Sequence, residues 1–325
     1  MKLVICGNGF DCHHKLRTSY DSYHSWLEIN APLVLEKFNG FPWVNKACIS
    51  NKWVDVEKTL SLDVSAMINA INDYSLDTNP ENVSECIVDF EDWTRFIYSF
   101  TGGEFYKWLS SIDTRQTTKD PKIEGALSDA ICITFNYTDT LETVYGIEKG
   151  RILHLHGSLD EVEEENCFGN DILPSFSTVE EAECYDKPVI ENDKWNSGII
   201  RNVIQFGAPR ESIDVKEEMD KKLNSEDKEL KELLFEFFQC TIKSLCRNLP
   251  KINSFLSGKR IDEVMIMGHS LNGPDDLYYT ECLIPKYRDK KWIIYWYNDG
   301  SQKDLCEKKV FCAKYGIKNV EYREW

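Results

Sequence analysis

The sequence predicts an α/β fold with a Rossmann-like, open parallel sheet that carries helical insertions. Apolar runs of strand length, such as "MKLVIC" and "AICITF", recur along the chain, and segments with helical spacing follow them. Glycines or polar turn residues stand where these runs end. Strands that alternate with helices are typical of parallel sheets, whose ligands lie beyond the carboxyl ends of the strands. We therefore expect a site at that edge.

The first element is a buried strand over residues 1–6, which a "GNG" turn at 7–9 follows. Glycine lets a ligand oxygen approach the backbone amides, and a helix that starts near Asp11 would direct its N-terminus at an anion. A full dinucleotide fingerprint needs a third glycine, and Cys12 occupies that position. A phosphate-binding turn and a plain strand-to-helix turn both remain open.

Helical segments follow. Leu16, Tyr20, Tyr23 and Leu27 have helical spacing within 11–28. Residues 53–112 also predict mostly helices, which we expect to form a packed layer. The next strand covers 130–135 and precedes a helix that starts near Thr138, and "RILHLHG" predicts a third strand.

The second half begins with an irregular, acidic segment over 158–206. Residues 211–249 predict a charged helical stretch, and "RIDEVMIMGHSL" and "KKWIIYWYND" predict two further strands, the latter followed by a helix through about Tyr315. We predict a single domain over 1–325 with inserted helical segments near 30–125 and 208–250.

Charge and cysteine content narrow the function classes. Lys and Arg number 38 against 55 Asp and Glu, so the net charge of −17 argues against nucleic acid as a partner. Twelve cysteines occur without a C-x-x-C pair, and no targeting segment precedes the first strand. This pattern favours reduced thiols and a cytoplasmic protein. The longest apolar runs are too short for a membrane helix, so we expect no membrane partner.

Polar motifs follow four of the predicted strands: "GNGFD", "FNYT", "HLHG" and "GHSL". Asn136 either serves the site or caps the following helix. His154 and His156 lie two residues apart, and we favour a functional role for His156 over a structural one. The pair could also ligate a metal if the fold supplied a third ligand, with Asp11, His13 or Asp275 as candidates.

A serine-hydrolase interpretation fails on two counts. Asn272 stands where the G-x-S-x-G motif requires its second glycine. That fold also places its base histidine after the serine, whereas His269 is the last histidine of the chain. We therefore expect Ser270 to cap a helix or to contact a ligand ribose or phosphate.

The motifs together resemble one known family. "GNGFD" with "TSY" after it, "WVDVE", "ITFNYTDTLE", "HLHG" and "MGHSLNGPD" closely resemble the bacteriophage abortive infection AbiH family in order and spacing. This resemblance implies antiphage defence. AbiH-type proteins are in turn similar in motif order to the SIR2-like group, whose Rossmann-like sheet binds NAD and whose defence members hydrolyse it.

The SIR2-like similarity implies roles for individual residues. Gly7 and Gly9 resemble the glycines beneath the pyrophosphate, with Asn8 replacing the intervening alanine. Asn136 resembles the asparagine that positions water near the nicotinamide ribose, and His156 resembles the histidine of the His-Gly motif.

Further correspondences and departures lie in the other motifs. Gly268 and Ser270 resemble the late turn that holds the cofactor ribose, while Thr138 replaces the aspartate of that group. The sirtuin zinc cysteines are absent, which argues against protein deacetylation. Asp11 and Asp139 are candidates for stabilising a cationic sugar, or for capping helices.

These correspondences give a predicted site. Asn136 and His156 are the expected catalytic residues, and no metal ligand is expected. The residues expected to contact the cofactor NAD are Gly7, Asn8, Gly9, Asp11, Thr138, Gly268 and Ser270.

We expect a defence protein with a nucleotide pocket that binds NAD and hydrolyses it. A metal-dependent hydrolase of nucleotides or nucleic acid that uses His154 and His156 is one alternative. A non-catalytic nucleotide sensor is another. The expected partners are a small-molecule nucleotide and a phage-derived trigger, and association with a second copy or another protein remains open.

Overall fold

The computed structural model describes residues 1–39, 103–159, 208–210, 221, 242–271 and 275–325. The chain divides into two compact units. Unit 1 comprises Met1–Ser19, Leu109–Glu161 and Leu245–Trp325, and unit 2 comprises Tyr20–Trp108 and Val162–Ser244. Large parts of the insertions predicted near 30–125 and 208–250 lie outside the described residues, so the single-domain organisation stays a prediction.

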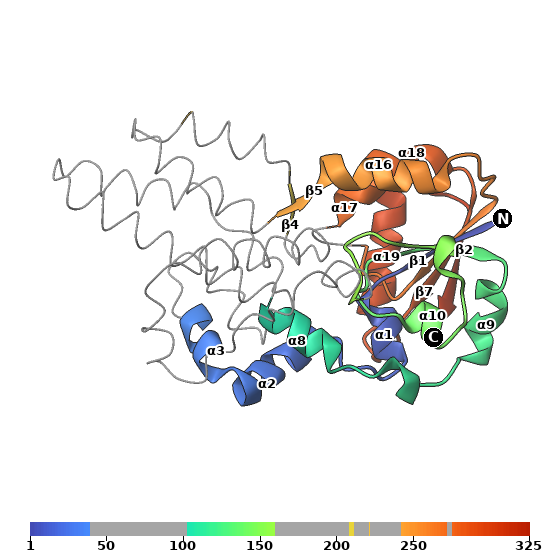
Figure 1. The fold of residues 1–325 in the computed structure, drawn as a ribbon. Helices are drawn as coiled ribbons and strands as arrows, with labels where there is room; N and C mark the ends of the chain where they lie inside the picture. Colours follow the sequence, from blue (N-terminus) through green and yellow to red (C-terminus); the bar gives the residue numbers. More distant parts are fainter. Residues whose placement is uncertain (40–102, 160–207, 211–220, 222–241, 272–274) are drawn as a thin grey trace. The chain divides into compact units, whose positions relative to one another are not determined.

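Unit 1 is built on a six-stranded sheet in the order β3-β2-β1-β6-β7-β8, and every neighbouring pair is parallel (Figure 1). The strands are β1 (Lys2–Cys6), β2 (Ala130–Thr134), β3 (Ile152–His154), β6 (Glu263–Met267), β7 (Lys291–Trp296) and β8 (Val320–Glu324). The predicted Rossmann-like open parallel sheet is confirmed.

The register brings the carboxyl ends of the central strands level with one another. Cys6 at the end of β1 pairs with Thr134 on one side and with Met267 on the other. Both faces of these strands are covered, which explains why their sequences are continuous apolar runs rather than alternating ones. The segments that follow the strands therefore begin at one edge.

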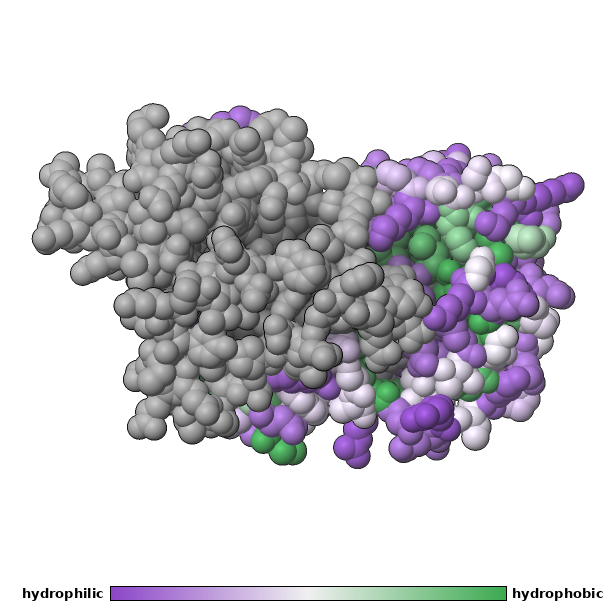
Figure 2. Space-filling model, in the orientation of Figure 1, coloured by the Kyte–Doolittle hydropathy of each residue, from purple (hydrophilic) through white to green (hydrophobic). Residues whose placement is uncertain are grey.

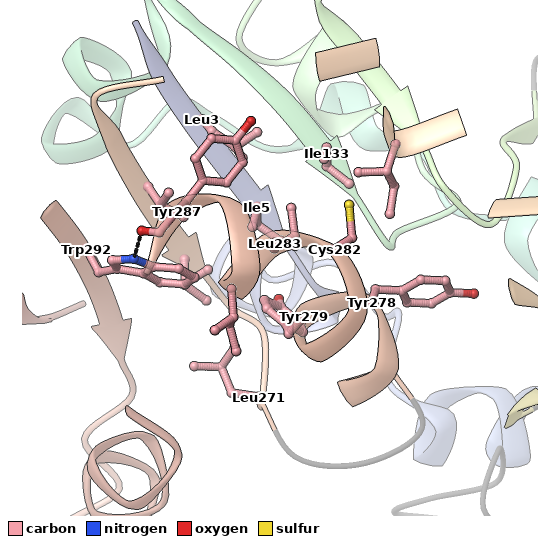
Figure 3. Close-up of a cluster of buried hydrophobic side chains, with 14 of the residues drawn as sticks. Leu3, Ile5, Ile133, Leu271, Tyr278, Tyr279, Cys282, Leu283, Tyr287 and Trp292 are labelled. Carbon is pink, nitrogen blue, oxygen red and sulfur yellow. Dashed lines mark hydrogen bonds between the residues drawn. The ribbon is translucent and has the colours of Figure 1, made fainter. Parts of the chain in front are cut away.

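Each face of the sheet carries its own hydrophobic core, because successive side chains of a strand point to opposite faces. Leu3, Ile5 and Ile133 belong to one core, and Val4, Cys6 and Cys132 to the other. Figure 3 shows the first core, in which the indole N–H of Trp292 donates to the carbonyl oxygen of Tyr287 at 2.9 Å.

Helices cover both faces (Figure 1). The first core receives side chains from α16 (Leu245–Leu256), α17 (Asp276–Tyr278), the π-helical turn η5 (Tyr279–Leu283), α18 (Ile284–Tyr287) and α19 (Lys303–Lys314). The second receives them from α1 (Asn8–His13), α9 (Pro121–Leu127) and α10 (Thr140–Thr143). Two short 3₁₀ turns, η2 (Thr114–Gln116) and η3 (Lys149–Arg151), complete the described elements of unit 1.

Several local predictions differ from the structure. The helix predicted over 11–28 is two helices, because Lys15 adopts a left-handed φ of 63° and the side chain of Asn8 donates to the carbonyl oxygen of Thr18 at 2.8 Å. The third strand ends at His154, before the histidine of the His-Gly motif. The strand β8 was not predicted, and neither was β5 (Ile242–Ser244), which lies within the stretch predicted to be helical.

The described part of unit 2 includes α2 (Tyr20–Asn30), α3 (Pro32–Asn39) and β4 (Ala208–Arg210), which pairs in parallel with β5. Helix α8 (Phe105–Ser110) crosses the boundary between the units. The ring of Tyr23 packs against Phe105 and Trp108, with centroids 5.3 and 4.9 Å away. Most of the helices predicted over 53–112, and nearly all of the irregular segment predicted over 158–206, lie outside the described residues.

The described surface is mostly hydrophilic on the face drawn in Figure 2, with hydrophobic side chains gathered mainly in one hollow. Among the described helices, none combines the length and the hydropathy needed to cross a bilayer.

Candidate functional site

The glycine turn after β1 packs directly against the turn after β6. The amide of Gly7 donates to the carbonyl oxygen of Met267 at 3.0 Å, and the amide of Gly9 donates to that of Gly268 at 2.8 Å. A Cβ atom at Gly9 would lie 2.7 Å from the oxygen of Gly268, and one at Gly268 would lie 1.9 Å from the nitrogen of Phe10. Main-chain packing between the two turns therefore requires glycine at these positions.

The amides of this turn are largely engaged within the protein. Besides the two bonds to the β6 turn, the amide of Phe10 donates to the carbonyl oxygen of Gly7 at 2.8 Å. Asn8 and Gly9 are exposed, and the side-chain amide of Asn8 holds the carbonyl oxygen of Thr18. A phosphate would thus meet an exposed turn in which the amides of Gly7, Gly9 and Phe10 already donate to protein carbonyls.

Asn136 joins the loop after β2 to the glycine turn. It is 7% exposed, and its Nδ2 donates to the carbonyl oxygen of Gly7 at 3.1 Å. Its own amide donates to Oγ1 of Thr134 at 3.0 Å. The N-cap position of α10 belongs to Asp139, so Asn136 does not cap that helix.

Asp11 and Thr138 also meet, although they are 127 residues apart. Oδ2 of Asp11 accepts from the hydroxyl of Thr138 at 2.6 Å, and Oδ1 accepts from that of Thr140 at 2.8 Å. Burial raises the pKa of Asp11 to about 6, against hydrogen bonds from Thr138, Thr140 and Asn136 that lower it. The carboxylate ties α1 to the segment that carries Asn136.

Asp139 is held separately. Its Oδ1 accepts from the hydroxyl of Thr114 at 2.6 Å, and its Oδ2 accepts from the hydroxyl of Thr143. These bonds give Asp139 a local role at the start of α10.

His154 has protein partners on both ring nitrogens. Its Nδ1 lies 3.1 Å from the carbonyl oxygen of Asn136, and its Nε2 lies 2.8 Å from Oε1 of Glu142. A carbonyl oxygen can only accept a hydrogen bond, so Nδ1 of His154 carries a hydrogen. A hydrogen bond between Nε2 and Glu142 then requires one further proton, which either group can carry. The ring therefore holds the backbone of Asn136 in place.

His156 lies in a different environment from His154. Its side chain is 1% exposed, and its Nε2 lies 3.6 Å from Oδ1 of Asp275. Nε2 of His269 lies 3.7 Å from Oδ2 of the same carboxylate. The ring of Phe135 makes edge contacts with both imidazoles, with centroids 5.2 and 4.6 Å away. Two histidines thus face one carboxylate beside an aromatic ring.

Most of the residues predicted for the site come together at the carboxyl edge of unit 1. Hydrogen bonds link Gly7 to Asn136, Gly9 to Gly268, and Asp11 to Thr138. His156 approaches the β6 turn through Asp275, and Ser270 is an exposed residue of that same turn.

A family model described as bacteriophage abortive infection AbiH matches residues 3–296. The chain belongs to the AbiH family. No curated protein and no solved structure matches it. The predicted resemblance is confirmed, and the AbiH family suggests a role in abortive infection, a form of antiphage defence.

Metal-ligating side chains do not gather in the described part of this AbiH protein: no group of three or more His, Cys, Asp or Glu residues there could hold an ion. His13, one candidate for a third ligand, pairs with Asp120 at 2.8 Å. His154 and His156 have different partners, so these two histidines do not form a shared ligand set within the described residues.

Several residues of the candidate site carry contacts that the sequence did not predict. His269 was noted as the last histidine, and Asp275 as one of several candidate metal ligands, but their contact with His156 was not foreseen. His269 directly follows Gly268, the glycine just after β6, and this position at a strand end indicates a candidate site residue. From the sequence, His269 was considered only as part of a serine-hydrolase motif. Glu142 and Thr140 carried no signal in the sequence, since either would suit a helix surface.

Proposed function

We propose that this AbiH protein binds NAD at the carboxyl edge of its six-stranded sheet and hydrolyses the nicotinamide–ribose bond during phage infection. The proposal extends the defence role of the family to a specific reaction. A phage-derived trigger and a small-molecule nucleotide are the partners it requires.

The convergence of Asn136, His156 and the glycine turn at one edge carries the proposal. The bond from Nδ2 of Asn136 to the carbonyl oxygen of Gly7 fixes the asparagine beside the turn. His156 reaches the same edge from the segment after β3. In open α/β sheets this edge is where nucleotides bind.

The chemistry of the residues suits the reaction. Cleavage of the bond between nicotinamide and ribose builds positive charge on the sugar, so the site must hold both parts and admit water. Asn136 supplies a rigid amide, and the buried carboxylate of Asp11 lies in the adjoining network. A neutral imidazole at His156 can accept a proton from water near pH 7.

Free backbone amides of the glycine turn cannot be the main phosphate ligands in this protein. The amides of Gly7, Gly9 and Phe10 donate within the protein, so we assign the pyrophosphate to the exposed side chains of Asn8 and Ser270 at the rims of the two turns. In this arrangement Gly268 packs against the glycine turn and does not contact the ligand.

The test is incubation of purified protein with NAD, ATP, RNA and DNA separately, with products analysed by mass spectrometry. We expect ADP-ribose and nicotinamide from NAD and no product from the others. The assay is repeated with extract from phage-infected cells, which supplies the trigger. Loss of ATP or nucleic acid with NAD intact would overturn the proposal.

Burial of the two catalytic candidates favours a second candidate function, a non-catalytic nucleotide sensor. His156 and Asn136 are 1% and 7% exposed. A sensor would bind NAD in calorimetry without consuming it, even when infected-cell extract is present.

A further inference from the structure

Three side chains form a compact acid–base cluster inside unit 1. Asp275 presents Oδ1 to Nε2 of His156 at 3.6 Å and Oδ2 to Nε2 of His269 at 3.7 Å. Both separations exceed the roughly 2.7–3.2 Å of a hydrogen bond, so the carboxylate acts on the rings through its charge. A nitrogen lone pair directed at a carboxylate is repelled, whereas an N–H is attracted.

The tautomer of His269 has an independent determinant. The amide of Leu271 donates to its Nδ1 at 3.1 Å, so Nδ1 is unprotonated and the hydrogen of the neutral ring lies on Nε2, facing Asp275. Leu271 is fully buried and has a left-handed φ of 60°, a strained conformation for a non-glycine residue. The turn after β6 therefore holds a strained residue whose amide orients this ring.

Local capping does not account for Asp275. It occupies the N-cap position of α17, where aspartate usually accepts from amides of the first helical turn. Its side chain makes no such hydrogen bond. The carboxylate instead lies between the two imidazoles.

We infer that Asp275 is a positioning residue that holds His156 in the tautomer with hydrogen on Nε2, leaving Nδ1 as the nitrogen that accepts a proton. His269 keeps the carboxylate oriented through its own Nε2–H. The part of this inference that concerns catalysis rests on the proposed NAD hydrolysis.

In that reaction every proton and electron pair has a stated destination. An O–H bond of water breaks and its proton passes to Nδ1 of His156, while the oxygen bonds to the ribose carbon that carries nicotinamide. The carbon–nitrogen bond breaks, and its electron pair leaves with nicotinamide, neutralising the pyridinium. Asp275 stabilises the imidazolium formed at His156, and the proton is released to solvent afterwards.

The test is a long-range ¹H–¹⁵N NMR spectrum of the histidine rings in the full chain, with signals assigned from His156→Gln and His269→Gln. We expect neutral His156 and His269 both to carry hydrogen on Nε2. In Asp275→Asn the new amide offers one oxygen acceptor and one NH₂ donor, so one ring must present a bare Nε2. Because the amide of Leu271 fixes His269, His156 should switch to the tautomer with hydrogen on Nδ1.

Asp276→Asn is the matched control, since it removes a neighbouring charge that acts on His269, and it should leave the His156 tautomer unchanged. A wild-type His156 with hydrogen on Nδ1 would overturn the inference even if the Asp275 variant failed to fold. So would a folded Asp275→Asn in which neither ring switches.

Assays of NAD turnover distinguish failure of this inference from failure of the proposed function. For wild-type protein that hydrolyses NAD, Asp275→Asn should lower kcat by about 10⁴-fold with little change in KM, as expected when a base holds the wrong tautomer. A tautomer switch in a protein that never consumes NAD would support the positioning role and reject the proposed reaction. Full turnover in Asp275→Asn would reject the positioning role and leave the reaction intact.

Discussion

Nδ2 of Asn136 donates to the carbonyl oxygen of Gly7 at 3.1 Å, although the two residues are 129 positions apart. This bond links the loops that follow β2 and β1. Asn136 therefore has a structural task beside the catalytic one proposed for it, and variants must be measured for both.

Asn136→Ala should lower the free energy of unfolding by about 0.5–1.5 kcal/mol, because the carbonyl oxygen of Gly7 loses one of its two donors and keeps the amide of Phe10. The same variant should lose most NAD turnover. Denaturant unfolding and NAD consumption measure the two effects. A variant with wild-type turnover would exclude Asn136 from the chemistry, whatever its stability.

Asn136→Ala and His156→Ala should each abolish most turnover, and the double variant should lose little more. Residues that serve one chemical step are strongly non-additive. Rates of NAD loss and survival of phage-challenged cells provide the measurements. If the two losses multiply instead, the residues act in separate steps.

His154→Ala is the internal comparison for His156→Ala. Removal of the imidazole takes away the partner of the Glu142 carboxylate, whose side chain is 17% exposed, so we expect a stability loss of about 1–3 kcal/mol. Turnover should fall less than in His156→Ala once the fraction of folded protein is taken into account. A folded but inactive His154→Ala beside an active His156→Ala would show that the wrong histidine was chosen.

Asp11 should make stability depend on pH. Burial raises its folded pKa from 3.8 to about 6, so the folded state binds more protons than the unfolded chain between those values. Its contribution to stability therefore decreases as the pH rises through about 4–6 and is constant above. Relative to wild type, Asp11→Asn should gain about 2 kcal/mol between pH 4 and pH 7. Denaturant titrations across this range test the sign, and a constant difference would contradict it.

Gly268→Ala should be far more destabilising than Gly258→Ala. Both glycines have a left-handed φ, of 67° and 71°, so the conformational cost is matched at about 1–2 kcal/mol. A Cβ at Gly268 would lie 1.9 Å from the nitrogen of Phe10, whereas nothing lies within 4 Å at Gly258. Thermal unfolding of the two variants isolates the packing effect, and equal melting temperatures would refute it. For the same reason, substitution at Gly9 would disturb folding and is a poor probe of phosphate binding.

The sequence allowed β1, β2, β6 and β7 to be predicted because these strands are buried on both faces and stand out as apolar runs. The edge strand β8 was missed because its residues are exposed or half-buried and mostly polar. Convergence of the motifs followed from parallel topology alone. The partners of each side chain did not follow from it. His154 and His156 are two residues apart, but β3 ends at His154, so strand alternation does not govern their surroundings. The pairing of Asp275 with two histidines depends on a turn with a left-handed leucine, which no local pattern indicates.

The strand order has a consequence for ligand recognition. Strands β2 and β3 add to one side of β1, and β6, β7 and β8 add to the other, so the direction of winding reverses between β1 and β6. Such a reversal normally opens a crevice. Here Gly9 and Gly268 pack main chain against main chain at the reversal. Substitution of either glycine would disturb this packing, so specificity for a ligand at the reversal would have to change through exposed residues beside the turns, such as Asn8 and Ser270.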